Sequence, residues 1–475
     1  MSISRFVVGI LVFASASVAH AACDVAADGD YFVDKDHPAA NDSNVGSADL
    51  PFVTIQHMID LLGPGDCAFV RESSVPYFED VRKSGSNRGG ITIDVEGTPT
   101  DRIIISGFPG ERPVIDIDRR NSTDENKEMA GFLVRNGNYV TIRNFEIRRA
   151  SAPGIFMSHN IRNTGITVEK MYIHHIYGGD NIGAVRLDLC HRCLVRDNVF
   201  HDIYDTRRDS NTLTDEPYGL HAGVHGYRPA ESIIEHNLIY NVARGVYEKQ
   251  SNYERLASNE VRYNVFRNIE GPAYEMSKQG SSQIAGNNAS FHHNIVLNAE
   301  SGLRIRWKGA GSQGRDVSVY NNTFINTDTI VAFSNVDRLE VYNNAIVGTN
   351  ERVCCNVIFS AEDPGDGLIN GVQYLDYNFF SADANQDWLF NRYTAELVVL
   401  HGLSELQAFG FGDSSEIGDL RVEGSGDYTL LPENVWSVAG RNGDQIGAAG
   451  AIQVGPRSAG ISVPKPPEDL VVNSQ

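Results

Sequence analysis

The fold is decided by a segment that recurs along the middle of the chain. It reads VTIRNFEI (140–147), ITVEKMYI (166–173), CLVRDNVF (193–200), SIIEHNLI (232–239), NEVRYNVF (259–266), ASFHHNIV (289–296), VSVYNNTF (317–324) and LEVYNNAI (339–346). Each copy has alternating apolar residues, then a polar pair, then two or three more apolar residues. A repeat of this length predicts one supersecondary unit per copy, and the alternation makes that unit a short β-strand.

Asparagine usually occupies the fifth or sixth position of each copy, and the residues at this place are Asn144, Lys170, Asn198, Asn237, Asn264, Asn294, Asn322 and Asn344. Such an Asn can bridge to the backbone of the next coil, and it tolerates the left-handed conformation of a sharp bend. Propeller blades are longer, at roughly 40 to 50 residues, and sandwiches do not repeat one Asn in phase. Connections between parallel strands are right-handed, so the coils are expected to wind in a right-handed helix. The sequence therefore predicts an all-β fold, a right-handed parallel β-helix.

The N-terminus has the features of a signal peptide. Arg5 gives a positive start, Phe6–Val18 is an apolar run, and Ala19-His20-Ala21 matches the small-x-small cleavage pattern. We expect cleavage before Ala22 or Cys23 and a secreted or periplasmic protein. A lipoprotein acylated at Cys23 is the alternative. No later segment is apolar enough to cross a membrane.

Three parts are expected: a signal peptide (1–22), a single β-helix domain with its N-terminal cap and closing coils (23–452), and a Pro-containing tail (453–475). The net charge of −21 argues against a nucleic-acid partner. Cys23 and Cys67 are candidates for a disulfide. The CxxC pair Cys190 and Cys193 is expected to be a local disulfide or two buried thiols.

Both ends of the chain resemble secreted right-handed parallel β-helix proteins. The stretches YFVDKDHPAANDSNVGSADLPFVTIQHMIDLLGPGDCAFVRESSVPYFEDV (31–81) and GTPTDRIIISGFPGERPVIDI (97–117) are similar to the opening of that family. GSGDYTLLPENVWSVAGRNGDQIGAAG (424–450) is similar to its closing coil. The resemblance implies a capping helix from Ile55 to Leu62, before the turn Pro64-Gly65-Asp66. It implies no particular reaction, because this fold serves lyases, hydrolases, epimerases and adhesion proteins alike.

The strand that follows each Asn segment is the expected working face, because stacked coils place equivalent side chains in rows. Aligned on a leading Gly or Pro, these strands begin at Gly154, Gly183, Gly219, Gly245, Pro272 and Gly302. Side chains alternate along a strand. The alignment predicts one outward row of His221, Tyr247, Tyr274 and Arg304, and a second of Gly223, Lys249, Met276 and Arg306.

Basic and phenolic groups concentrated on an acidic protein predict an anionic polysaccharide substrate. The long insertion from Asp205 to Tyr218 is expected to form one wall of a cleft. β-Elimination of a uronic acid needs a base, a cation for the carboxylate and an acid for the leaving oxygen. We expect Lys249 as the base, Arg304 or Arg306 as the carboxylate clamp, and Tyr247, Tyr274 or His221 as the acid or as part of a Tyr/His base pair. The expected substrate-binding residues are Lys278, Arg186, His225 and Lys308.

This constellation resembles β-helix polysaccharide lyases of the alginate lyase and chondroitin B lyase type. There a Lys base and an Arg one coil away flank a calcium ion held by acidic residues, so the resemblance implies Lys249 as the base and Ca²⁺ as a cofactor. Two features depart from that pattern. The next-coil position carries Met276, and Glu248 directly precedes Lys249 in place of a spaced pair of Glu residues.

Three alternatives stay open. Glu248 and Glu275 are aligned on adjacent coils and expected to point inward. If the phase slips by one residue, they lie outside and about 4.8 Å apart, close to the carboxyl separation of a retaining glycoside hydrolase. A C5-epimerase shares the proton abstraction, and a non-catalytic glycan-binding solenoid needs no chemistry. The two His of HAGVHG (221–226) are a further candidate for a metal site.

Overall fold

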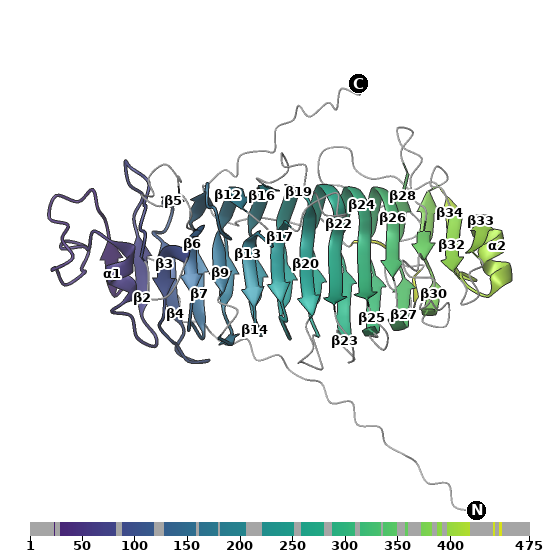
Figure 1. The fold of residues 1–475 in the computed structure, drawn as a ribbon, viewed down its shortest axis with the longest axis horizontal. Coiled ribbons are helices and arrows are strands. Elements are labelled where there is room, and N and C mark those ends of the chain that lie inside the picture. Colours follow the sequence, from purple (N-terminus) through teal and green to yellow (C-terminus); the bar gives the residue numbers. More distant parts are fainter. Residues whose placement is uncertain are drawn as a thin grey trace, which may run out of the picture.

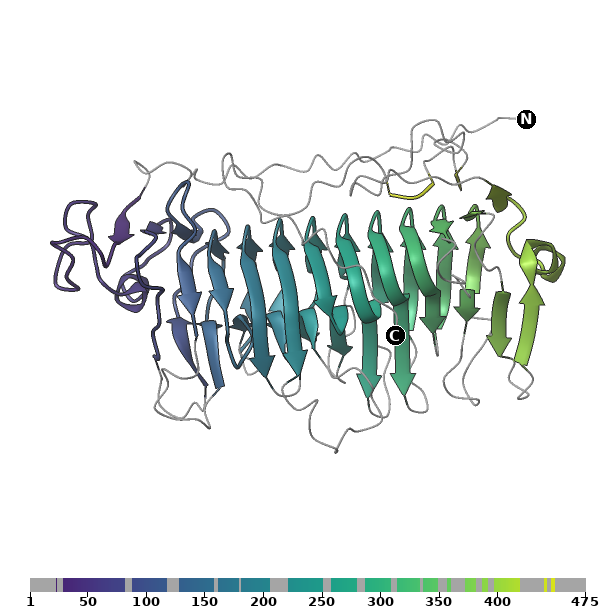
Figure 2. The ribbon, with the colours of Figure 1, turned by 90° about the horizontal axis from the view of Figure 1, so that it is seen from above.

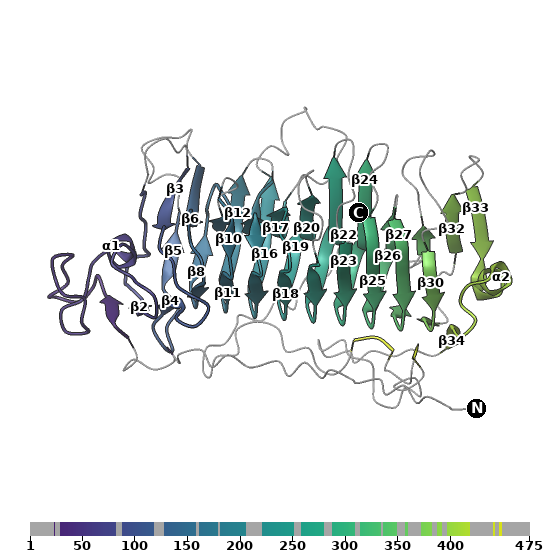
Figure 3. The ribbon, with the colours of Figure 1, turned by 90° about the horizontal axis from the view of Figure 1, so that it is seen from below.

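The chain folds into an elongated stack of β coils in which successive coils follow one another along the long axis (Figure 1). Figures 2 and 3 show the same order of coils from two opposite sides. The computed structural model describes residue 23 and residues 29–81, 88–117, 128–157, 161–178, 181–205, 221–250, 258–279, 287–308, 314–333, 336–348, 357–359, 372–381, 387–391, 397–418, 440–441 and 446–448. The predicted signal peptide, the tail and residues 206–218 of the insertion lie outside these residues.

The first face of the stack is a sheet of twelve parallel strands. It contains the first half of each repeated segment. Its strands are β1 (Tyr31–Val33), β2 (Cys67–Val70), β4 (Ile103–Gly107), β7 (Val140–Arg143), β11 (Thr167–Glu169), β15 (Leu194–Arg196), β18 (Ile233–Glu235), β21 (Glu260–Arg262), β23 (Asn287–His292), β25 (Gly314–Tyr320), β27 (Val336–Tyr342) and β30 (Val372–Asp376).

The second and third faces belong to one 17-stranded sheet, because three long strands bend from one face to the other. These long strands are β22 (Val265–Gln279), β24 (Ile295–Lys308) and β26 (Thr323–Phe333). The second face adds β5 (Val114–Asp116), β8 (Glu146–Arg148), β12 (Tyr172–Gly178), β16 (Val199–Asp205), β19 (Leu238–Val242), β28 (Ala345–Val347), β31 (Phe379–Ser381) and β34 (Glu416–Gly418). The third face adds β3 (Arg88–Ile93), β6 (Glu128–Val134), β9 (Ile155–Met157), β13 (Gly183–Asp188), β17 (Ala222–Tyr227) and β20 (Arg244–Gln250).

The remaining elements lie beside the three faces. They are α1 (Ile55–Ile59), the paired β10 (Asn163–Thr164) and β14 (Cys190–His191), the sheet of β29 (Val357–Phe359), β32 (Asp387–Asn391) and β33 (Leu397–His401), and α2 (Gly402–Phe409). Helix α1 occupies the N-terminal end of the stack (Figure 1) and begins where the predicted helix does. Its role as a cap stays a prediction. Neither helix among the described residues is long and apolar enough to cross a membrane.

The interior of the stack is one continuous apolar core. Inward side chains from all three faces join a single cluster that runs from Val33 near the first coil to Leu406 near the last. Burial of apolar surface at about 25 cal/mol per Å² is the main force that holds such coils together. The predicted right-handed parallel β-helix is confirmed. The pairs Cys23–Cys67 and Cys190–Cys193 are both disulfide-bonded.

A ladder of buried Asn side chains crosses the turn between the first and second faces. Asn264 shows the pattern, since its Nδ2 donates to the carbonyl of Ile234 at 2.9 Å and its Oδ1 accepts from the backbone N–H of Asn237 at 3.0 Å. The members are Asn198, Asn237, Asn264, Asn294, Asn322, Asn344 and Asn378. The predicted bridge between coils is therefore confirmed.

The left-handed conformation belongs to the residue before the ladder Asn, so the prediction that one Asn provides both the bend and the bridge is wrong. Asn144 (φ 66°) and Lys170 (φ 56°) hold this preceding position, which Asp197 (φ 55°) and Tyr263 (φ 53°) hold in later coils. The ladder position in the coil of Lys170 is Met171, whose N–H donates to Oδ1 of Asn198 at 2.9 Å. In each coil, the first of these two neighbouring residues thus forms the bend, and the second holds the position that bridges to the next coil.

Candidate functional site

The third face carries two rows of polar side chains on the side away from the core. The first row runs across the paired strands as Arg186, His225, Tyr247, Glu275 and Arg304. The second row is Asp188, Tyr227, Lys249, Ser277 and Arg306. The residues between them point inward, because Leu187, Met276 and Ile305 belong to the apolar core.

Six of the ten predicted site residues lie in these two rows: Arg186, His225, Tyr247, Lys249, Arg304 and Arg306. The predicted face is therefore the one that gathers the basic and phenolic groups. The predicted register between the strands is wrong in two places, and the four other residues fall elsewhere or outside the described side chains.

The first error concerns β22. Its partner positions are Tyr247 with Glu275 and Lys249 with Ser277, whereas the alignment predicted Tyr274 and Met276. A β-bulge between Ile269 and Pro272 adds one residue to β22 relative to β24. A bulge of this kind shifts every following side chain to the opposite side of the strand. Tyr274 is therefore a core residue, and its prediction as an acid is wrong.

The second error concerns β17, where two glycines compete as the anchor. Gly223, and not Gly219, matches Gly245, because a Cβ at Gly223 would lie 3.0 Å from the carbonyl oxygen of Gly245 in the next coil. His225 consequently pairs with Tyr247. His221 precedes β17 and does not belong to either row, so its predicted place beside Tyr247 is wrong.

The side chains of Lys278 and Lys308 lie outside the described residues. The backbone of Lys278 pairs with Trp307, and that of Lys308 pairs with Gln279. Their predicted role in substrate binding stays a prediction.

Lys249 lies at the centre of the second row. Its Nζ donates to Oδ1 of Asn181 at 2.6 Å and to the hydroxyl of Tyr227 at 3.4 Å. The ammonium also lies 5.4 Å from the ring centre of Tyr227 and 5.3 Å from that of Tyr247, within the range of cation–π attraction. An amine and a phenol are thus held next to each other on the outer side of the sheet.

His225 is a buried imidazole between the two tyrosines. Its ring centre is 5.0 Å from that of Tyr227 and 5.1 Å from that of Tyr247. Burial lowers the pKa of His225 well below its usual value, and the nearby charges of Arg186 and Lys249 act in the same direction. Among the described residues neither ring nitrogen has a hydrogen-bond partner. A neutral imidazole with a free donor and a free acceptor is suited to contact a bound polar molecule.

The carboxylates of both rows are held by arginines. Nε of Arg186 donates to both oxygens of Asp188, at 3.0 and 3.1 Å. Nε of Arg244 donates to Glu275 Oε2 at 2.7 Å, and Nη1 of Arg306 lies 3.9 Å from Glu275 Oε1. These two acids are therefore neutralised within the face.

Arg304 and Arg306 are the partly exposed cations of the neighbouring coil. Arg304 forms an ion pair with Glu300 at 2.5 Å through Nη2, while its buried Nε has no hydrogen-bond partner in the described part of the chain. Arg304 and Arg306 are the last members of the first and second rows, two residues apart on β24. Two adjacent guanidinium groups can bind a carboxylate through parallel N–H donors.

Glu248 and Glu275 lie on opposite sides of the sheet, so the predicted hydrolase pair is wrong. Glu248 is buried in the core, where its carboxylate accepts from Asn259 Nδ2 at 3.0 Å and from the hydroxyl of Tyr274 at 3.1 Å. Burial raises the pKa of Glu248 to about 7, although both hydrogen bonds oppose the rise. Glu275 belongs to the outer first row.

Sequence reasoning missed Tyr227, Arg244 and Asn181. Tyr227 pairs with Lys249 in the second row, and burial raises the pKa of its hydroxyl. Tyr227 follows His225 by two residues in the sequence. The alignment on Gly219 placed it outside both predicted rows. Asn181 precedes β13 and contacts Lys249 across 68 residues of chain, which no local pattern could reveal.

Comparison with known proteins supports the fold and leaves the reaction open. No protein-family model and no curated protein sequence matches the chain. A solved rhamnogalacturonan lyase is similar, with a TM-score of 0.52 and 13% identity over 70% of this chain and 84% of that one. The pectate lyase Pel9A has a TM-score of 0.50 and 16% identity over 72% and 82%. The resemblance to β-helix polysaccharide lyases therefore holds at the level of the fold.

Proposed function

We propose that the chain is a polysaccharide lyase that cleaves a uronate-containing glycan by β-elimination. The observation that carries the proposal is the Lys249–Tyr227 pair on the outer third face, with Arg304 and Arg306 on the same two rows. The chain as a whole has a net charge of −21, so a surface that gathers cations is unexpected unless it serves an anionic ligand. The two similar solved structures that are described as polysaccharide lyases agree with this choice.

The proposed reaction begins with binding of the uronate carboxylate. Arg304 and Arg306 donate hydrogen bonds to it and neutralise the charge that grows on the carboxylate as the C5 proton leaves. The Arg304 Nε–H, which lacks an acceptor in the described residues, is available for this contact. Buried donors already fixed in place stabilise the enolate-like state without reorganisation.

Lys249 and Tyr227 of the second row carry out the proton transfers. Lys249 reacts as the neutral amine, after its ammonium has lost one proton to solvent. The amine takes the proton from C5, the C4–C5 double bond forms, and the C4–O4 bond breaks. The Tyr227 hydroxyl, 3.4 Å from Lys249 Nζ, gives a proton to O4 of the leaving sugar. A base and an acid this close to each other serve an elimination in which both groups leave on one side of the ring. Tyr247 and His225 pack beside this pair and hold it in place.

Calcium does not fit the described donors of this face. The carboxylates of Asp188 and Glu275 are already paired with Arg186, Arg244 and Arg306, and Ca²⁺ needs six to eight oxygen ligands. Arginine charges fill the role that a cation would have, and no step of the proposed reaction passes through a metal.

The test is a panel of uronate polymers, namely polygalacturonate, alginate, chondroitin sulfate and glucuronan, incubated with the purified protein. We expect ultraviolet absorbance from the unsaturated uronate on at least one polymer. New reducing ends without that absorbance would replace the proposal with a hydrolase. Exchange of C5 hydrogen with solvent deuterium without chain cleavage would indicate a C5-epimerase, and binding without any reaction would indicate a glycan-binding solenoid.

A further inference from the structure

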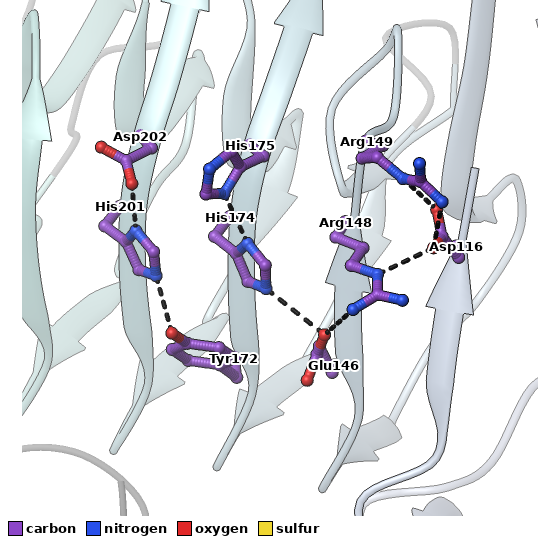
Figure 4. A network of polar contacts seen from close by, with 9 residues as sticks. All are labelled: Asp116, Glu146, Arg148, Arg149, Tyr172, His174, His175, His201 and Asp202. Atoms are coloured by element: carbon purple, nitrogen blue, oxygen red, sulfur yellow. Dashed lines mark hydrogen bonds and ion pairs between the residues drawn. The ribbon is translucent and has the colours of Figure 1, made fainter. Parts of the chain in front are cut away.

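A second cluster of titratable side chains lies at the bend within β12 and β16, away from the third-face rows. It consists of His174 and His175 on β12 and of His201 and Asp202 on β16, and Figure 4 shows the two pairs stacked on consecutive coils. The rings of His174 and His201 are parallel, with centres 5.0 Å apart. We call these four residues the corner cluster.

The bend normally carries asparagine. His175 (φ 54°) and Asp202 (φ 55°) have the left-handed conformation that Asn241 (φ 52°) and Asn268 (φ 51°) adopt at the same bend in the next coils. The asparagines form an outer ladder, in which Asn268 Nδ2 donates to Asn241 Oδ1 at 3.4 Å and Asn241 Nδ2 donates to Asp202 Oδ1 at 3.3 Å. The coil before them has Arg149 (φ 58°) at this bend, so three consecutive coils lack the amide, and two of them carry an imidazole and a carboxylate.

The replaced side chains converge. His175, His201 and Asp202 each place one potential ligand atom within 4.8 Å of the others. Nδ1 of His174 lies 2.7 Å from Nδ1 of His175, and Nδ1 of His201 lies 2.7 Å from Oδ2 of Asp202. Zinc binds imidazole nitrogen and carboxylate oxygen at about 2.0–2.2 Å. To hold one ion, the three ligand atoms must each come to about this distance from a common point.

Outer partners orient the imidazoles toward this point. Nε2 of His174 lies 3.4 Å from the Glu146 carboxylate, and Nε2 of His201 lies 2.9 Å from the hydroxyl of Tyr172. Nδ1 of His174 faces His175 on the opposite side of the ring from this carboxylate. Metal-binding histidines commonly have such a carboxylate or hydroxyl on the far nitrogen.

The nearby arginines do not oppose a cation. Asp116 accepts from Nε of Arg148 at 2.8 Å and from Nε of Arg149 at 2.7 Å, and Arg148 also contacts Glu146 at 3.1 Å (Figure 4). Their charges are thus neutralised by two carboxylates outside the corner cluster.

We propose that His175, His201 and Asp202 bind one late first-row divalent ion, of which Zn²⁺ is the representative, and so join two consecutive coils. Two imidazoles and one carboxylate suit Zn²⁺, Ni²⁺ or Cu²⁺ better than Ca²⁺ or Mg²⁺, which prefer oxygen ligands. On binding, the ion takes the place of the proton between His201 Nδ1 and Asp202, and the neutral imidazole carries its one proton on Nε2, where it donates to the hydroxyl of Tyr172. The site is independent of the third-face chemistry.

The chain supplies a matched control at another turn. His292 and His293 form the same kind of pair, with their Nδ1 atoms 2.8 Å apart, but the side chain that meets His293 from the next coil is the amide of Asn321, at 3.4 Å. A pair of histidines without the stacked carboxylate should not hold the ion tightly.

The test uses the full-length, tag-free protein after treatment with EDTA and dialysis, titrated with ZnCl₂ by calorimetry and followed by thermal unfolding. We expect one Zn²⁺ per chain, a rise in Tm with Zn²⁺ and none with CaCl₂. His175→Asn and Asp202→Asn should each weaken binding by about 10-fold or more, while His293→Asn binds as the unaltered protein does. Both asparagine variants keep the residue type that Asn241 shows to be compatible with the bend, so a folded protein is expected.

Two results would overturn the proposal. The first is the absence of stoichiometric Zn²⁺ uptake by the unaltered protein. The second is uptake that both His175→Asn and Asp202→Asn leave unchanged, which would place the ion elsewhere.

Discussion

The Asn ladder and the third face are built from the same coils but use repetition in opposite ways. In the ladder, seven consecutive coils from Asn198 to Asn378 give the same side chain and the same two contacts. In the first row of the third face, five consecutive coils give Arg, His, Tyr, Glu and Arg. The comparison teaches that this solenoid repeats the side chains that hold neighbouring coils together and varies those on the face that we propose binds a ligand.

The largest effect is expected at the centre of the varied face. Lys249→Ala should lower kcat on the uronate polymer by about 10² to 10⁴-fold, because the reaction loses its base. Initial rates measured by ultraviolet absorbance check this. Lys170→Asn is the matched control, since Asn144 occupies the equivalent left-handed position one coil earlier. Equal losses in both variants would contradict a chemical role for Lys249.

Removal of one of the two arginines that bind the carboxylate should lower activity somewhat less. Arg306→Ala is expected to lower kcat/KM by about 10²-fold, because the developing charge loses one donor while Arg304 remains. The exposed Arg192, paired with Glu231 at 2.7 Å, gives the control Arg192→Ala. Unchanged kinetics in Arg306→Ala would remove this residue from the site.

The repeated ladder should respond in stability and not in chemistry. Asn264→Ala leaves the N–H of Asn237 and the carbonyl of Ile234 buried without partners, which should lower the free energy of unfolding by about 2–4 kcal/mol. Urea unfolding measures the loss. Asn268→Gly, on the partly exposed outer ladder and still able to adopt a left-handed conformation, should cost about 1 kcal/mol or less. Equal losses would show that burial does not distinguish the two ladders.

A smaller effect on stability is expected for Glu248. Among the described residues of the third-face strands, it is the one acid whose side chain points into the core. Because burial raises its pKa from 4.5 to about 7, the folded state favours the protonated form. Its contribution to stability is complete below pH 4.5 and is lost as the pH rises through about 7. The free energy of unfolding should therefore fall by roughly 2–3 kcal/mol over this interval.

Glu248→Gln isolates this effect, because the amide oxygen can accept from Asn259 and Tyr274 without ionising. Urea unfolding at a series of pH values should show a smaller fall for the variant than for the unaltered protein. Parallel profiles would mean that Glu248 does not titrate in the core.

The sequence was sufficient for the fold and for the choice of face, but not for the register. The Asn repeat predicts stacked coils directly, because one residue type at the same place in successive repeats indicates the same structural role in each coil. The register of β22 depends on a bulge between Ile269 and Pro272, which inserts a residue without changing the apolar pattern. That bulge exchanged Tyr274 for Glu275 in the outer row.

The contacts across coils were out of reach for a different reason. Tyr227 aligns with Lys249 only when Gly223, and not Gly219, is aligned with Gly245. The choice between the two glycines depends on the close approach of the Gly223 and Gly245 backbones. Asn181 reaches the site from the turn before β13, and Arg244 from the first residue of β20. Such contacts depend on three-dimensional spacing and leave no periodic signal.

The most direct test of the central claim is the crystal structure of Lys249→Ala with a bound uronate tetrasaccharide. The account predicts a sugar carboxylate within hydrogen-bond distance of Arg304 and Arg306, and the adjacent glycosidic oxygen next to the hydroxyl of Tyr227. A tetrasaccharide bound on another face, or on the third face with its carboxylates away from both arginines, would contradict it.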